Sequence, residues 1–151
     1  MNALSKAGLI GALASGAMLA GCATVEEAVV QKTAETYHAT LTGAQETHGG
    51  DPDGYATAQL SVADRIDQVC YDINDIRNIG PITAIHIHRG APGVDGPPVW
   101  TLKQANEGGW KDCTDKAEWM QDAFENHFRG FYVNIHTTEY PNGAIRGQFG
   151  D

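Results

Sequence analysis

Apolar and polar residues alternate along most of the chain after residue 36, with the period of two that half-buried β-strands show. The clearest runs are residues 37–43 and 56–62, and a third at 69–73 places Cys70 on its polar face. Further strands are predicted at residues 82–89, 99–102, 131–136 and 144–149. Clusters of Gly, Pro, Asn and Asp separate the runs. The pattern therefore predicts seven short strands, the last two forming an antiparallel hairpin.

One segment, residues 115–128, has a helical period instead. Its apolar residues recur at helical spacing: Ala117, Met120, Phe124 and Phe128. Asp115 and Glu118 have the spacing of a capping pair, and Gly130 follows as a stop signal. Short strands with turn signals and one helix in a long connection predict an all-β fold. We expect a Greek-key β-sandwich of about seven to eight antiparallel strands.

Composition limits the function classes. With 151 residues the chain forms one folded domain, and a 42% apolar content excludes a disordered chain. Ten Lys and Arg stand against 19 Asp and Glu, for a formal net charge of −9. Such an acidic chain is a poor nucleic-acid binder, so we expect no nucleic-acid partner.

The N-terminal segment has the pattern of an export signal. A short basic start is followed by 14 residues, 7–20, interrupted only by Gly and Ser. The stretch ends in Leu19-Ala20-Gly21-Cys22, which resembles the bacterial lipobox. We expect a signal peptide at 1–21, a lipidated Cys22 that anchors the protein to a membrane, a tether at 22–36 and a domain at 37–151. The location would be the periplasmic side of the cell envelope. Ala23 at the next position favours the outer membrane.

A lipidated Cys22 leaves two cysteines, Cys70 and Cys113, in an oxidising compartment. Two such thiols most simply form a disulfide. Use of the two as thiolate metal ligands is the alternative.

Histidines form the main candidate site. His86 and His88 are two residues apart in a predicted strand, so both imidazoles project from the same face. His136 lies on another strand, on one face with Tyr132 and Asn134. Three imidazoles from two strands suit copper or zinc, although many such histidines are structural. A fourth ligand could come from His38 or His48, while His127 is better explained by the C-terminal end of the predicted helix.

The residues 37–149 resemble the CHRD domain, a family found in chordin and in bacterial exported proteins. The matching segments are residues 41–46, 54–60, 69–71, 86–90 with Gly93, Gly96 and Pro97, 132–137 and 140–147. One departure is Thr47-His48-Gly49, where the family usually continues Val-Pro-Pro. The resemblance implies an all-β sandwich and places His86, His88 and His136 in the family's hallmark motifs, which makes copper the leading ion and zinc the second. The arrangement also looks like copper/zinc superoxide dismutase, in which an Arg lies near the copper, a part that Arg146 could take.

These observations lead to two hypotheses. The first is a lipid-anchored envelope protein that binds copper for copper handling or redox chemistry, with superoxide dismutation left open as an enzyme activity. Candidates for orienting the imidazoles or meeting an anion are Tyr132, Tyr140, Arg146 and Glu46. Each also has a structural explanation: hairpin packing for the tyrosines, a strand-edge charge for Glu46 and a surface ion pair for Arg146. The second hypothesis is a non-enzymatic interaction or adhesion module with structural histidines. A homodimer stays open, and no hydrolase motif is present.

Overall fold

Antiparallel β-strands make up the fold in the computed structural model, which describes residues 34–63, 66–115, 120, 123 and 126–150. Within these residues there are eight strands: β1 (Glu35–Thr42), β2 (Tyr55–Ala63), β3 (Gln68–Arg77), β4 (Ile82–Arg89), β5 (Pro98–Thr101), β6 (Trp110–Asp115), β7 (Phe131–Thr137) and β8 (Ile145–Gln148). A short 3-10 turn, η1 (Gly43–Gln45), follows β1. The predicted all-β class and strand number are confirmed.

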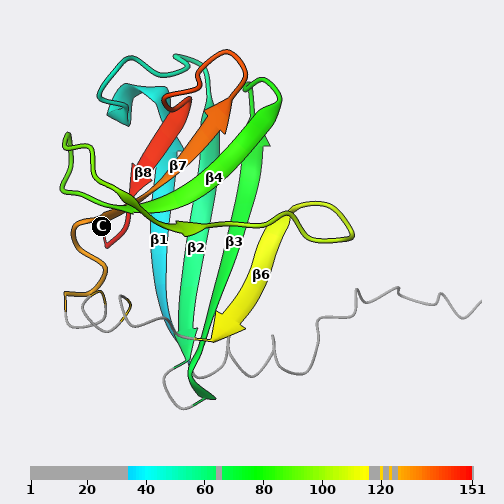
Figure 1. The fold of residues 1–151 in the computed structure, drawn as a ribbon, viewed down its shortest axis with the longest axis vertical. Helices are drawn as coiled ribbons and strands as arrows, with labels where there is room; N and C mark the ends of the chain where they lie inside the picture. The colour runs from blue at the N-terminus through cyan, green and yellow to red at the C-terminus, as the bar shows by residue number, and fades with distance from the viewer. Residues whose placement is uncertain (1–33, 64–65, 116–119, 121–122, 124–125, 151) are drawn as a thin grey trace, which may run out of the picture.

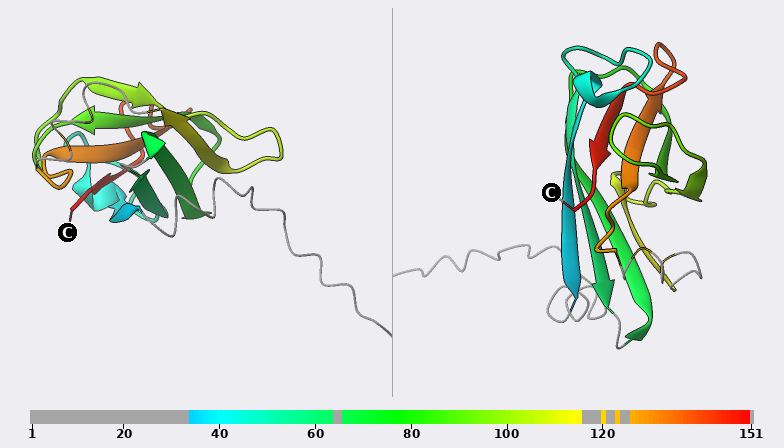
Figure 2. Two further views of the ribbon diagram at one scale, coloured as in Figure 1. Left: turned by 90° about the horizontal axis from the view of Figure 1, so that it is seen from below. Right: turned by 90° about the vertical axis from the view of Figure 1, so that its left-hand side faces the viewer.

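The strands form one curled sheet in the order β5-β4-β7-β8-β1-β2-β3-β6 (Figure 1). β1 and β8 join through a single register pair, Thr42 with Arg146, whereas β1 and β2 pair along their whole length. The sheet bends so that β4, β7 and β8 face β1, β2 and β3 (Figure 2). A β-sandwich is built from two separate sheets. In this protein the two layers are instead the two halves of one continuous hydrogen-bonded sheet.

The core lies between the two halves and is built by the alternation seen in the sequence. Leu41 and Leu60 from one half, and Ile85 and Ile135 from the other, are all 0% exposed and belong to one cluster. Each fully buried side chain of this size stabilises the fold by about 1.5–3 kcal/mol. Because successive strand residues point to opposite faces, the neighbouring positions on β4 and β7 lie on the outer face of the sheet.

The segment from residue 110 to 128 differs from the prediction at its start. Residues 110–115 form β6, which pairs with β3, so Asp115 is the last residue of a strand and pairs with Gln68, whereas Met120 and Ala123 are helical as predicted. This strand has no apolar alternation because it is a charged edge strand, and the pattern alone could not identify it. Phe128 lies in a turn with φ +54° and packs on Tyr37 at 4.7 Å between ring centroids. Most of the predicted helix, Ala117, Glu118 and Phe124 among it, lies outside the described residues.

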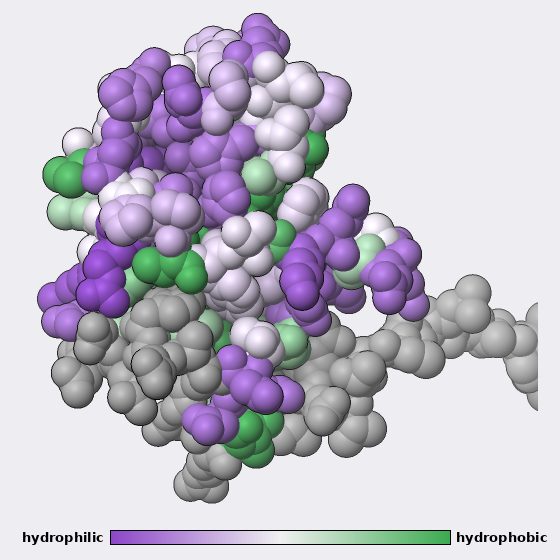
Figure 3. Space-filling view, viewed as in Figure 1, coloured by the Kyte–Doolittle hydropathy of each residue, from purple (hydrophilic) through white to green (hydrophobic). Residues whose placement is uncertain are grey.

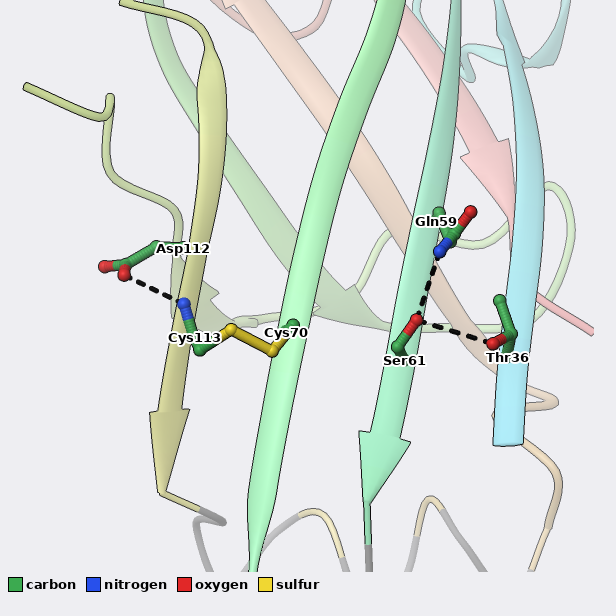
Figure 4. Close-up of a disulfide and its surroundings, with 6 residues drawn as sticks. All are labelled: Thr36, Gln59, Ser61, Cys70, Asp112 and Cys113. Carbon is green, nitrogen blue, oxygen red and sulfur yellow. Dashed lines mark hydrogen bonds between the residues drawn. A yellow bond between two sulfur atoms is a disulfide. The ribbon is translucent and has the colours of Figure 1, made fainter. Parts of the chain in front are cut away.

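A disulfide joins Cys70 on β3 to Cys113 on β6, as predicted. The two residues are directly opposed in the β3–β6 register, and the bridge lies on the outer face of the sheet (Figure 4). Both cysteines are therefore unavailable as thiolate ligands.

The predicted signal peptide, Cys22 and most of the tether lie outside the described residues. Among the residues that are described, no helix combines the length and apolar character that crossing a membrane requires.

Candidate metal centre

The three predicted histidines meet on the outer face of β4 and β7. In the antiparallel register of β4 and β7, His136 is opposite Ala84 and Asn134 is opposite His86. His136 and His86 are therefore diagonal neighbours on the same face, and their imidazoles are in contact. His88 is opposite Tyr132. Hydrophilic residues gather over β4, β7 and β8 on the face seen in Figure 3. Strand alternation therefore produces both the core on one face and a polar cluster on the other.

The cluster is close enough to share one ion. One ring nitrogen from each of His86, His88 and His136 lies within 4.8 Å of the other two. The ring centroids of His86 and His136 are 4.9 Å apart, and the two rings share a hydrogen bond of 3.1 Å between His86 Nδ1 and His136 Nε2. Among the described residues, this is the group of His, Cys, Asp and Glu side chains with the spacing of a metal site.

Backbone carbonyls determine which nitrogen of two of the rings carries the proton. His88 Nδ1 donates to the carbonyl of Gly96 at 2.9 Å, and His136 Nδ1 donates to the carbonyl of Pro141 at 3.0 Å. A carbonyl only accepts, so in the neutral rings Nε2 keeps its lone pair. Metal-bound histidines commonly have their second ring nitrogen held in this way.

The Nε2 atom of His88 is buried and has no hydrogen-bond partner. The side chain is 8% exposed, so solvent does not satisfy this atom either. An unsatisfied buried acceptor costs about 1–3 kcal/mol, and such atoms are uncommon in folded proteins. The lone pair is therefore placed where an added ligand would satisfy it.

The surroundings of His86 and His88 favour their neutral forms. Burial is the main cause that lowers the pKa of His86 and of His88 below the ordinary value. The neighbouring imidazoles act in the same direction, because three positive rings at this spacing would repel one another. Neutral imidazole is the form that binds metals.

Tyr132 packs against the histidine cluster, and Arg146 packs against Tyr132. The Tyr132 ring stacks on His88 with 4.8 Å between centroids and 9° between planes, and its hydroxyl accepts from the Gly96 backbone N–H. The guanidinium of Arg146 lies 3.4 Å from the centre of the same Tyr132 ring. Arg146 is 1% exposed and donates to the carbonyls of Ala91 and Val94. It is therefore a buried residue that holds the loop carrying Gly96, and its Nη1 also forms an ion pair with the half-exposed carboxylate of Asp95 at 3.4 Å.

Other sequence candidates lie at the edge of the site or away from it. Glu46 reaches Asn134, with Nδ2 donating to Oε2 at 3.4 Å, and burial raises the Glu46 pKa to about 7. His48 lies at the rim and pairs with Asp95 at 2.9 Å. Tyr140 contributes backbone hydrogen bonds to the turn after β7, not a side-chain contact with the cluster. His38 is exposed on β1, beside a different cleft.

A cleft of about 320 Å³ opens beside His88 and His136. Tyr132, Asn134 and Gly96 line it, with the side chains of His48, Asp95 and Asn142 at its loops. The carbonyls of Gly96 and Pro141, and the side chain of Asp95, were not predicted to contribute to the site. Asn134 did have a signal in the sequence, because it precedes His136 by two residues in the same strand and so lies on the same face. The loop residues had none, since loop conformations have no periodic pattern.

The comparisons with known proteins agree with the resemblance seen in the sequence. The family model of the CHRD domain matches residues 37–149, which is most of the chain and covers every strand from β2 to β8. Neither the curated proteins nor the solved structures include a match. The three histidines and the residues that hold them all lie within the matched range, and the chain belongs to the CHRD domain family.

Proposed function

We propose that this protein is a lipid-anchored protein of the bacterial cell envelope that binds copper through His86, His88 and His136. Its role would be copper handling or redox chemistry at an open coordination position. The observation that carries the proposal is the buried, unpartnered Nε2 of His88 beside two further imidazoles. A structural histidine would have both ring nitrogens satisfied.

The donor set favours copper. Imidazole nitrogens suit copper and zinc, and copper(II) binds most tightly of the common divalent first-row ions. The ring nitrogens lie within 4.8 Å of one another. Ligand bonds of about 2.0–2.1 Å need nitrogen separations of roughly 3.3 to 4 Å, which small side-chain rotations provide. Zinc at the same three nitrogens is the competing occupant.

Three protein ligands leave a position for a small molecule, which is the arrangement of catalytic sites rather than closed structural ones. The cleft beside His88 and His136 gives access to it. Arg146 is not placed to guide an anion there, because it donates to backbone carbonyls and lines a separate cleft with Glu46 and Gln148. The proposal therefore does not include superoxide dismutation by analogy with copper/zinc superoxide dismutase.

The lipid anchor rests on the Leu19-Ala20-Gly21-Cys22 motif. Expression in a bacterial host with a radiolabelled fatty acid tests it. The wild-type chain would incorporate the label and sediment with membranes, whereas Cys22→Ala would do neither. Equal labelling of the two chains would contradict the anchor without affecting the metal proposal.

Copper uptake tests the binding site. The purified protein, dialysed against copper and then against buffer, would retain one equivalent of copper per chain. His86→Ala/His88→Ala would retain almost none, and His38→Ala, which removes an exposed histidine on β1, would match the wild type. Equal retention in the wild type and the double variant would overturn the proposal. A wild type without copper or zinc, together with a protein partner recovered by crosslinking, would favour an interaction module.

A further inference from the structure

Asn134 occupies the centre of the polar face that carries the histidines. In the strand register it lies opposite His86 on β4 and opposite Arg146 on β8, and it precedes His136 by two residues on the same face. Its side chain is 5% exposed and lines the cleft beside His88 and His136. Its Oδ1 atom is buried without a hydrogen-bond partner. A second unsatisfied acceptor thus lies at the same site as His88 Nε2.

The orientation of the Asn134 amide is set by Glu46. The Nδ2 group donates to Glu46 Oε2, so Oδ1 is the atom left without a partner. Gly143 leaves room for this contact: a Cβ there would lie 2.6 Å from Glu46 Oε2 and 2.8 Å from Asn134 Nδ2. The ionised Glu46 carboxylate only accepts hydrogen bonds and cannot pair with Oδ1, so at pH values above its pKa it opposes rotation of the amide.

The remaining charges at the cleft do not favour an anion. Asp95 lines it with a half-exposed carboxylate that pairs with Arg146 Nη1 at 3.4 Å, and the same buried guanidinium donates to the carbonyls of Ala91 and Val94, so it is not free for an anion. Among the described residues that line the cleft there is no Lys or Arg, and His48 is already paired with Asp95. The chain as a whole carries a formal net charge of −9. Both the local acceptors and the overall field act against negative ligands.

From these contacts we infer that the open position takes a neutral ligand that donates a hydrogen bond, such as water, hydrogen peroxide or a small alcohol, and discriminates against anions. Asn134 Oδ1 is the acceptor that sets this selectivity, and Glu46 is the positioning residue that orients it. The inference rests on the proposed copper site and names the class of small molecule that reaches it.

Azide titration of the copper(II)-loaded, full-length protein tests the selectivity, read from the charge-transfer absorption that azide gives on copper(II). Azide is an anion that accepts hydrogen bonds but donates none. Asn134→Leu keeps the branched shape and the net charge but removes the acceptor, so azide would bind about tenfold more tightly or better. Asn134→Asp would bind azide more weakly than the wild type. Gln59→Leu, on the outer face of β2 (Figure 4), is the matched control and would leave azide affinity unchanged.

Glu46 variants test the positioning role. Glu46→Leu frees the amide to turn Nδ2 toward the cleft, so azide affinity would rise as in Asn134→Leu. Glu46→Gln keeps an acceptor for Nδ2 and would retain the affinity of the wild type. A structural role of Glu46 would instead change copper content in both variants.

Copper content and the electron paramagnetic resonance spectrum before azide addition separate the two claims. A wild type that takes up no copper contradicts the proposed function and this inference with it. Normal copper content with the same azide affinity in the wild type, Asn134→Leu and Glu46→Leu contradicts the inference alone.

Discussion

The disulfide between Cys70 and Cys113 gives the most quantitative prediction, because it closes a loop of known length. The sequence separation is 43 residues, and cross-linking a loop of that length stabilises the folded chain by about 4 kcal/mol through the entropy of the unfolded state. Both cysteines are only partly buried on the outer face, so the double variant Cys70→Ala/Cys113→Ala creates little cavity in the core. The loss should therefore come almost wholly from loop entropy.

Urea denaturation of the metal-free protein measures this loss. The free energy of unfolding of the double variant should be about 4 kcal/mol below that of the wild type, and the reduced wild type should match the variant. β3 and β6 are not neighbours of β4 or β7 in the sheet, so the folded variant should retain copper. A loss under about 1 kcal/mol would refute the loop-entropy reasoning. Loss of copper from the folded variant would refute the independence of the two halves of the sheet.

Three further predictions concern the site. Burial raises the Glu46 pKa from 4.5 to about 7, so between these pH values the folded state holds a proton that the unfolded state releases. Glu46 therefore destabilises the fold increasingly as the pH rises from about 4.5 to about 7. Denaturation across that range should show Glu46→Gln gaining stability relative to the wild type as pH rises; a constant difference would contradict the burial of the carboxyl. A Cβ on Gly96 would overlap the Arg89 carbonyl oxygen, so Gly96→Ala must move the loop that holds His88. Copper affinity, measured by competition with a chelator, should fall about tenfold or more. Gly80→Ala, which has open space around it, should leave the affinity unchanged. Free copper at about 100 times its dissociation constant should stabilise the wild type by about 2.7 kcal/mol in thermal or urea unfolding and leave His86→Ala/His88→Ala unchanged; equal stabilisation of both would indicate binding elsewhere.

Much of the fold follows from the alternation of apolar residues. Leu60 and Ile85, at alternate apolar positions of their strands, are fully buried, and His86 and His88 lie on the opposite face as the period of two requires. The β6 strand could not be identified, because an exposed edge strand has no buried face to produce a pattern. The continuous curled sheet was also beyond prediction, since it depends on how closely β1 and β8 approach.

The histidine site was predictable in its strands but not in its loops. The spacing of His86 and His88 was sufficient to place both on one face of their strand, whereas the approach of His136 depends on the pairing of β4 with β7. The acceptors for His88 and His136 are backbone carbonyls of Gly96 and Pro141, and a carbonyl is common to every residue type, so the sequence carries no signal for them. Arg146 was assigned to the anion side of the site by analogy. Its burial under the 91–96 loop depends on a tertiary contact that no local pattern encodes.

The central claim, that three imidazole nitrogens bind one copper ion, is tested most directly by electron paramagnetic resonance of the copper(II)-loaded protein grown with isotopically labelled histidine. We expect nitrogen hyperfine structure from three imidazoles that changes with the histidine isotope and is lost in His88→Ala. A spectrum of bound copper whose hyperfine structure does not depend on the histidine isotope would contradict it.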